Sequence, residues 1–410
     1  MRLLFILLVG VSLVFAATYY VAKTGDDGNV GSEAEPWLTI SHAVPLVVAG
    51  DSVWVKAGTY DESLWVRGCK AGTAAAPIVF KSYDGWSTII NGWVQLDSAY
   101  YYLEDFKVSP DSNGIVQVIK INGDSCIIRG CEITPVVPNG YWAGGILTTS
   151  DGNLIDGNTI HHNGDSAKVH GIYSSHKNQT ITNNVIYGQY VHGIQAYPAI
   201  ESSEIAYNII YGNGGAGIVL EGRTTRVHGN VIYDNAQVGA SAGIQSYGAI
   251  GCDIYNNVCD GPLLLSVGGA ESLSIRNNIF TGGMNSYTNV LTTLTMNYNC
   301  WYPGGVPGGW TFQWFGGGHG NFAQFQAATG QETNGFTADP LFVDTATHNF
   351  RLTLGSPCID AGDPATPNTL DMDGNYYMGL PDMGAYWYDG GPILPDTVRI
   401  ILKSLLWGGE

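Results

Sequence analysis

A short motif recurs through the middle of the chain at intervals of 21–27 residues, each time ending in an apolar residue. Its copies are DFKV, GCEI, GNTI, NNVI, YNII, GNVI, NNVC, NNIF and YNCW. Their second residues, the anchors, are Phe106, Cys131, Asn158, Asn184, Asn208, Asn230, Asn257, Asn278 and Asn299. The position three residues before each anchor is also apolar. A repeat of this length with paired apolar flanks indicates one coil of a solenoid per copy.

The flanking residues are mainly isoleucine and valine, which favour strands, and turns separate them. Stacked strands lie about 4.8 Å apart, so a column of asparagines can hydrogen-bond from coil to coil. Leucine-rich repeats have a similar period, but their leucine consensus and their helix per repeat are absent from this sequence. We therefore predict an all-β, parallel β-helix solenoid of roughly ten or more coils.

A solenoid needs caps over its open core, and both ends of this chain carry candidates. Residues 36–48 (PWLTISHAVPLVV) predict a short amphipathic capping helix that Pro45 ends or bends. We expect a signal peptide (1–16), an N-terminal cap with the first coils (17–100), central repeats (101–301), C-terminal coils and loops (302–389) and a tail or attachment segment (390–410). In the tail Asp396 is a candidate N-cap, and a docking helix and a docking strand are both open.

Several stretches outside the repeat resemble a known superfamily. The segments TYYVAKTGDDGNVGSEAEPWLTISHAV, GDSVWVKAGTYDESLWV and PIVFKSYDGWSTIING resemble the start of polysaccharide lyase family nine. The segments ADPLFVDTATHNFRLTLGSPCIDAG and DMGAYWY resemble the end of secreted bacterial β-helix proteins. With the repeat, they make nearly all of the mature chain similar to the right-handed parallel β-helix superfamily of the pectate-lyase type. Family-nine lyases use a catalytic lysine and an aspartate-built calcium site, and their Asp-rich stretch has no clear match here.

The first sixteen residues, MRLLFILLVGVSLVFA, have the charged start, apolar stretch and small-residue end of a secretory signal peptide. They predict a secreted or cell-surface protein of bacterial type, with no transmembrane helix in the mature chain. The formal net charge of -18 argues against nucleic acid as a partner, because phosphate binding requires a basic surface. We expect a monomer whose partner is a polysaccharide.

The chain has seven cysteines, an odd number, so at least one lacks an intrachain partner. No spacing among them suits a zinc site, and several occupy inward positions of the repeat. Most are therefore expected to be buried thiols, and the pairing of any disulfide stays open.

A second strand recurs around a Gly-Ile pair, in GGILTTS, HGIYSSH, HGIQAYP, AGIVLEG and AGIQSYG. Its isoleucines are expected to point inward: Ile146, Ile172, Ile194, Ile218 and Ile244. Alternation along a strand then turns outward Leu147, Tyr173, Gln195, Val219 and Gln245, and two positions further on Thr149, Ser175, Tyr197, Glu221 and Tyr247. Five of the nine histidines lie between His161 and His192, and His170 and His192 each come just before one of these strands.

This outer face has the residue types that bind and process a sugar polymer. The predicted substrate-binding residues are Gln195, Tyr197, Glu221, Arg223, Gln245 and Tyr247, and the predicted catalytic residues are His170, His192, Lys168 and Tyr173. Removal of the proton next to a uronate carboxyl group requires a base, an acid and a cation. Histidine has a suitable pKa without perturbation, a lysine of lowered pKa could replace it, and Tyr173 could act as the acid. These assignments predict a lyase or C5-epimerase acting on an acidic, uronate polysaccharide.

Other interpretations stay open. A glycoside hydrolase of this fold would need two carboxylates, and Glu221 is the main acidic residue of the face. A non-catalytic glycan binder, adhesin or structural surface protein would need only the aromatic and amide groups. His170 and His192 could share a transition metal, and calcium is a candidate cofactor, with DMDGN near Asp371 resembling part of a calcium loop. Glu221 and Arg223 could also simply form a surface ion pair.

Overall fold

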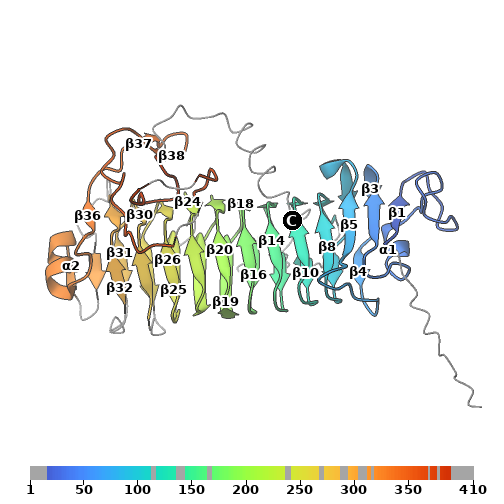
Figure 1. Cartoon of the computed structure of the whole chain (residues 1–410), viewed down its shortest axis with the longest axis horizontal. Helices are drawn as coiled ribbons and strands as arrows, with labels where there is room; N and C mark the ends of the chain where they lie inside the picture. The colour runs from blue at the N-terminus through green and yellow to red at the C-terminus, as the bar shows by residue number, and fades with distance from the viewer. Residues whose placement is uncertain are drawn as a thin grey trace, which may run out of the picture.

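The chain folds into three long sheets of parallel strands that stack along one axis, as Figure 1 shows. The computed structural model describes residues 16–111, 117–134, 144–163, 169–235, 242–266, 272–286, 294–302, 312–314, 318–367, 370–375 and 379–388. Within these ranges each of the three sheets has twelve strands, and the chain visits the sheets in rotation. The predicted all-β parallel solenoid is confirmed.

The strands are short, and each sheet takes one strand from each coil. Sheet A contains β1 (Thr18–Val21), β2 (Ser52–Val55), β5 (Ile78–Ser82), β8 (Tyr101–Glu104), β11 (Ile127–Arg129), β14 (Leu154–Asp156), β17 (Thr180–Thr182), β20 (Glu204–Ala206), β23 (Arg226–His228), β26 (Asp253–Tyr255), β29 (Ser274–Arg276) and β32 (Thr295–Asn297). Sheet B contains β3 (Gly58–Tyr60), β6 (Thr88–Ile90), β9 (Lys107–Val108), β12 (Glu132–Ile133), β15 (Thr159–His161), β18 (Val185–Tyr187), β21 (Ile209–Tyr211), β24 (Val231–Tyr233), β27 (Val258–Cys259), β30 (Ile279–Phe280), β33 (Cys300–Trp301) and β36 (Phe336–Thr337). Sheet C contains β4 (Leu64–Val66), β7 (Val94–Leu96), β10 (Gln117–Ile121), β13 (Gly144–Thr148), β16 (Ile172–Ser174), β19 (Ile194–Glu201), β22 (Ile218–Arg223), β25 (Ile244–Tyr247), β28 (Leu263–Ser266), β31 (Met284–Ser286), β34 (Phe312–Trp314) and the antiparallel β35 (Gly318–Gly320).

The core is a column of aliphatic side chains from all three sheets. In sheet C the register pairs the predicted inward isoleucines directly, with Ile146 opposite Ile172 and Ile172 opposite Ile194. All five predicted isoleucines are fully buried. Because strand side chains alternate, the same register stacks their neighbours on the outer face.

A ladder of asparagine side chains runs along the turn between sheets A and B. Asn158 Nδ2 donates to Asn184 Oδ1 at 2.9 Å, and each ladder asparagine donates in the same way to the next one, through Asn208, Asn230, Asn257, Asn278 and Asn299. Asn299 Nδ2 ends the ladder by donating to Glu332 Oε1 at 2.7 Å. The predicted column of asparagines is confirmed. It provides hydrogen-bond partners for polar groups that water does not reach.

The residue before each anchor has a left-handed backbone, which explains the recurring GN, NN and YN pairs. At all nine positions φ is positive, from 53° at Asn256 to 65° at Asp105 and Gly157. Glycine and asparagine adopt this conformation at low cost, whereas Tyr207 and Tyr298 adopt it only because the surrounding turn requires it.

Short helices lie at the two ends of the stack (Figure 1). The predicted capping helix is a single turn, α1 (Ile40–Ala43), which begins at the N-cap Thr39 and buries Ile40 and Ala43. At the other end α2 (Phe322–Thr329) has a capping box of Asn321 and Gln324, and it buries Phe322 and Phe325 against the last coils. A 3-10 turn (Gly85–Ser87) completes the helical elements of the described residues.

The C-terminal segment folds back over the outer face of sheet B (Figure 1). Its hairpin pairs β37 (Phe342–Asp344) with β38 (Asn349–Leu352) in antiparallel fashion. Phe350, Leu352 and Cys358 pack with the outward-facing Val258 and Cys300 of sheet B. Six of the seven cysteines are buried, as expected, and Cys69 is partly exposed.

The described helices are too short and too polar to cross a membrane. The predicted signal peptide, apart from Ala16, and the tail from residue 390 onward lie outside the described residues, as does Lys168.

Candidate functional site

The outer face of sheet C carries the row of side chains that the sequence predicted. The register places Leu147 opposite Tyr173 and Tyr173 opposite Gln195, and the row continues through Val219 to Gln245. Tyr173, Gln195 and Gln245 are partly exposed. Val219 faces the same way but is only 5% exposed, because Ala216, Ala242 and Leu264 cover it. The row therefore has a small apolar patch in its middle.

Four of the predicted residues form a cluster on this face, which we call the sheet C cluster: Tyr173, Tyr197, Glu221 and Tyr247. The rings of Tyr197 and Tyr247 lie 6.4 Å apart at 73°. Burial raises the pKa of Tyr173, and the nearby Tyr197 and Glu221 raise it further. Burial also raises the pKa of Glu221. A carboxyl group and a phenol with raised pKa values therefore lie together among aromatic rings.

A bulge in β19 lies at this cluster. The register of β19 against β22 shifts between Ala196 and Ile200, so Tyr197 and Pro198 lie in the irregular stretch. Pro198 is exposed and follows a cis peptide bond. Tyr197 still faces outward as the alternation predicts, and its ring lies near that of Tyr247, two coils away along the stack.

His170 and His192 lie beside the cluster, stacked with ring centroids 5.2 Å apart at 11°. His170 is also 5.8 Å from the ring of Tyr173. Burial lowers the pKa of His192 to about 4, and burial together with His192 lowers the pKa of His170 to about 3. Both imidazoles are thus neutral at ordinary pH, and the expectation of an unperturbed histidine pKa is wrong for this pair.

The tautomer of His192 follows from its hydrogen bond. The backbone N–H of Ala216 donates to His192 Nδ1 at 2.9 Å, so Nδ1 carries no proton and Nε2 carries it. His192 therefore presents a donor. His170 Nδ1 is buried and has no hydrogen-bond partner among the described residues, which leaves its tautomer open.

The other three clustered histidines lie elsewhere. His161 is on sheet B, where its ring stacks on Tyr187 at 4.9 Å and its Nε2 lies 3.2 Å from Glu132. His162 follows it in a left-handed turn, and His176 contacts Ser175. The fold thus brings only two of the five histidines to the sheet C cluster.

Arg223 is the last of the predicted substrate-binding residues. Arg223 is exposed near the end of β22, in register with Glu201. Although Glu221 and Arg223 face the same side of this strand, no ion pair within 4.0 Å joins these two described residues. The predicted pairing of Glu221 with Arg223 is therefore not formed.

The sequence argument missed the upstream part of the same face. On β4 and β7, Trp65 Nε1 donates to Asp97 at 2.9 Å, and Gln95 and Asn122 also donate to this carboxylate. Burial acts to raise the pKa of Asp97, but these hydrogen bonds and the charge of Lys120 hold it below its usual value. The tryptophan-containing stretches SLWV and NGWVQL carry the same alternation as the Gly-Ile strands and could have revealed this part.

The metal interpretations have little support in the side chains present. No three histidine, cysteine, aspartate or glutamate side chains of the described residues lie close enough together to hold an ion. In DMDGN the Asp371 carboxylate already accepts from the backbone N–H groups of Asp373, Asn375 and Trp387. These residues form a hydrogen-bonded turn, and calcium as a cofactor stays a prediction.

The three stacked sheets define the fold as a parallel β-helix. The family described as "Right handed beta helix region" matches residues 98–259. Among solved structures, pectate lyase Pel9A superposes with a TM-score of 0.57 over 91% of this chain and 96% of its own, at 17% identity. A rhamnogalacturonan lyase gives 0.54 over 68% and 84%, at 14% identity. Likeness at this level of identity shows a shared fold.

Two curated sequences are more similar over short stretches. Pectate lyase PEL9 of Emericella nidulans is 38% identical over 79 residues, 19% of each chain. The uncharacterized protein YwoF of Bacillus subtilis is 35% identical over 104 residues, 22% of each chain. The chain thus spans about a fifth of the length of the curated relatives that it matches. The predicted resemblance to the β-helix superfamily and to family nine is confirmed.

Proposed function

We propose that this chain is a carbohydrate-active enzyme that acts on an acidic polysaccharide at the sheet C cluster, by β-elimination or C5-epimerisation. The observation that carries the proposal is the cluster itself, where two groups of raised pKa lie among aromatic rings on one face of parallel strands. The polysaccharide lyases among the structures of similar fold support it.

Both reactions begin with removal of the proton next to the uronate carboxyl group. Glu221 is the first candidate for the base, because its raised pKa makes its carboxylate a stronger base than an ordinary one. Neutral His170 is the second candidate, and Lys168, outside the described residues, is the third.

Tyr173 is suited to act as the acid. Its pKa is raised above the usual value near 10, so it keeps its proton at neutral pH and can donate it to the leaving oxygen. His192 Nε2–H is a second donor toward the same region. In an epimerisation the same acid would return a proton to the opposite face of the carbon.

The substrate carboxylate needs a cation, and the acidic chain supplies a few on this face. Arg223 is exposed on β22, the strand that carries Glu221. Further along the face lie Lys120 and Arg67, whose guanidinium is 4.9 Å from the ring of Trp65. These side chains would position an anionic polymer along the coils. The proposal includes export by the predicted signal peptide and a monomeric state.

The test is ultraviolet absorbance of the unsaturated product over a panel of uronate polysaccharides, with calcium and with a chelator. Tyr173→Phe and Glu221→Gln are each expected to lower kcat at least 100-fold, the range for loss of an acid or base. Tyr211→Phe, at a half-buried tyrosine of sheet B, is the matched control and is expected to keep full activity. Exchange of the substrate proton into heavy water detects epimerisation. No product and no exchange on any polymer would refute the proposal.

The alternative is a glycan-binding protein without catalysis, and one observation favours it. Tyr173, Gln195 and Gln245 are partly exposed in one row, and Tyr247 is exposed beside them. A row of exposed aromatic and amide groups along the coils suits binding of a polymer without catalysis. Binding of polyuronate that is lost in Tyr197→Ala, without turnover or exchange, would establish this alternative.

A further inference from the structure

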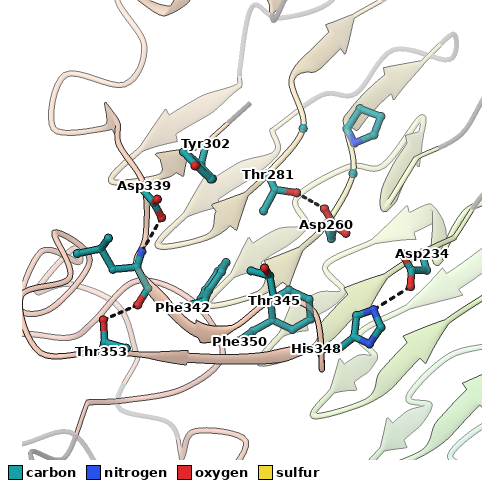
Figure 2. A pocket seen from close by; sticks show the side chains of 14 residues that line it. Asp234, Asp260, Thr281, Tyr302, Asp339, Phe342, Thr345, His348, Phe350 and Thr353 are labelled. Carbon is teal, nitrogen blue, oxygen red and sulfur yellow. Dashed lines mark hydrogen bonds and ion pairs between the residues drawn. The ribbon is translucent and has the colours of Figure 1, made fainter. Parts of the chain in front are cut away.

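A cavity lies between the outer face of sheet B and the β37–β38 hairpin. Its volume is about 800 Å³. Figure 2 shows side chains from both parts of the chain pointing into it. Sheet B and its turns contribute Asp234, Asp260, Gly261, Pro262, Thr281, Gly282 and Tyr302; the C-terminal segment contributes Asp339, Leu341, Phe342, Thr345, His348, Phe350 and Thr353.

The polar groups of this hairpin cavity are carboxylates held by single, well-defined partners. The Thr281 hydroxyl donates to Asp260, and the backbone N–H of Leu341 donates to Asp339 at 2.8 Å (Figure 2). Asp339 raises the pKa of Tyr302, whose side chain lines the same cavity. A carboxylate can accept about four hydrogen bonds, so both groups keep acceptor capacity after these contacts. The cavity is therefore rich in oriented acceptors.

A contact between His348 and Asp234 joins the hairpin to sheet B at the edge of the cavity. His348 Nε2 lies 2.9 Å from Asp234, and the His348 ring stacks on Tyr233 at 4.2 Å. Tyr233 continues a stack of sheet B tyrosines, with Tyr211 5.0 Å from it and Tyr187 4.9 Å from Tyr211. The ladder of rings thus holds the hairpin at a set position, and His348 is a positioning residue.

The floor of the cavity is apolar. The rings of Phe342 and Phe350 meet edge to face at 5.2 Å, and Leu341, which is 40% exposed, extends the apolar surface to the rim. An apolar surface beside a few fixed polar groups is the usual composition of a small-ligand site. Apolar ring atoms of a sugar suit the phenylalanines, and its hydroxyl groups suit the carboxylates.

The charge of the cavity selects among sugars. Three aspartates line it, and its described lining contains no lysine or arginine. A uronate carboxylate would be repelled here, in contrast to the face of sheet C with its three cations. Hydroxyl and ammonium groups, which donate hydrogen bonds, are attracted.

We propose that the hairpin cavity is a second carbohydrate site, which binds a sugar unit that carries hydroxyl or ammonium groups and no carboxylate. This site is independent of the sheet C cluster and of the reaction proposed there. A chain with both sites would hold an acidic polymer at one site and a neutral or amino-sugar polymer at the other.

The experiment is calorimetric titration of the full chain with short oligomers of three kinds: chitosan-type, cellulose-type and polygalacturonate-type. Binding of the first or second kind is expected, and Asp260→Asn and Asp339→Asn should each weaken it at least tenfold. Binding of the chitosan-type oligomer that falls with added salt would assign the ammonium group as the determinant, and salt-independent binding of both would assign the hydroxyl groups. Tyr302→Phe, which removes one hydroxyl and keeps the ring, is a milder variant in case an aspartate variant unfolds.

Glu221→Gln is the matched control, since it alters the sheet C cluster and should leave this binding unchanged. Binding that survives all three cavity variants, preferential binding of the acidic oligomer through Asp260 and Asp339, or no binding of any oligomer would each overturn the proposal. These outcomes are separate from the activity assay, so failure of one proposal does not decide the other.

Discussion

The regular coils, residues 144–302, and the C-terminal segment, residues 336–388, are held in place in different ways. In the coils the same contact is repeated from one turn to the next, as when Asn208 accepts from Asn184 and donates to Asn230. In the C-terminal segment each contact occurs once, as when the Arg351 guanidinium forms a two-pronged hydrogen bond with Asp373.

The comparison shows where chemical variety can enter a solenoid. A repeated contact restricts the residue at every coil, because equivalent side chains must stack at the inter-strand distance. A segment packed across the coils carries no such restriction. At the hairpin cavity the C-terminal segment places Asp339 and His348 next to sheet B. The row of outward tyrosines ends there, and Asp260 takes the next position.

The first prediction concerns the repeated contact. Asn208→Ala removes the acceptor of the Asn184 backbone N–H and amide, and the donor to the Ile181 carbonyl, all of them buried. Each buried polar group left without a partner costs about 1–3 kcal/mol, so a loss of roughly 3–5 kcal/mol is expected in denaturant unfolding. Lys177→Ala, which breaks an exposed ion pair with Glu201 on a neighbouring coil, should have a much smaller effect. Equal losses in both variants would contradict the importance of the ladder.

The second prediction concerns a covalent link between the two regions. Cys300 of β33 and Cys358 of the C-terminal segment are both fully buried in the same cluster, and the nearby Cys300 together with burial raises the pKa of Cys358. Refolding in oxidised glutathione is expected to join them: the two thiols lose two protons and two electrons, and the glutathione disulfide becomes two thiols. The link should add about 2–4 kcal/mol to the free energy of unfolding.

Mass spectrometry of unreduced peptides measures this link. A crosslinked peptide pair that contains Cys300 and Cys358 is expected, and Cys358→Ser is the control that must lack both the crosslink and the added stability. Recovery of both cysteines as thiols after oxidative refolding would disprove it.

The regular region could be predicted from the sequence and the C-terminal region could not, for a physical reason. The anchor motif recurs nine times, with asparagine in seven copies, and the Gly-Ile strand recurs five times, so weak signals reinforce one another. Both Ile194 and Asn208 are where the repeat places them. Asp234 and His348 are 114 positions apart and meet once, so no period marks their contact. The burial of His170 could not be predicted from the repeat either, because it depends on the side chains packed around the turn before β16.

The third prediction concerns the end of the ladder. Burial raises the pKa of Glu332 from 4.5 to about 7, against hydrogen bonds from Asn299 and Trp301 that act to lower it. Between pH 4.5 and 7 the folded chain therefore binds a proton that the unfolded chain does not. The free energy of unfolding should fall as the pH rises through this window, by up to about 3 kcal/mol.

Denaturant unfolding at a series of pH values between 4.5 and 8 measures this slope. Glu332→Gln cannot titrate, so the variant is expected to lose the part of the slope that Glu332 contributes, whereas Asp371 and Asp382, whose pKa values burial raises to about 6, keep theirs. The exposed Glu35→Gln should keep the slope of the natural chain. A slope of the opposite sign, with stability rising from pH 5 to 7 only when Glu332 is present, would show that its pKa is lowered instead.

The fourth and smallest effect is expected for a contact within the C-terminal segment, between Arg351 and Asp373. Arg351 Nε and Nη2 donate to the two oxygens of Asp373 at 2.8 and 2.7 Å, and the guanidinium lies 4.6 Å from the ring of Tyr386. Lysine cannot form the two-pronged contact, so Arg351→Lys should cost about 1 kcal/mol. Because the loss is confined to a region without repeats, hydrogen exchange should quicken in residues 336–388 and stay unchanged in β14 to β24. Arg129→Lys, at an exposed arginine of β11, should alter neither. Faster exchange along the coils in Arg351→Lys would mean that the two regions unfold as one unit.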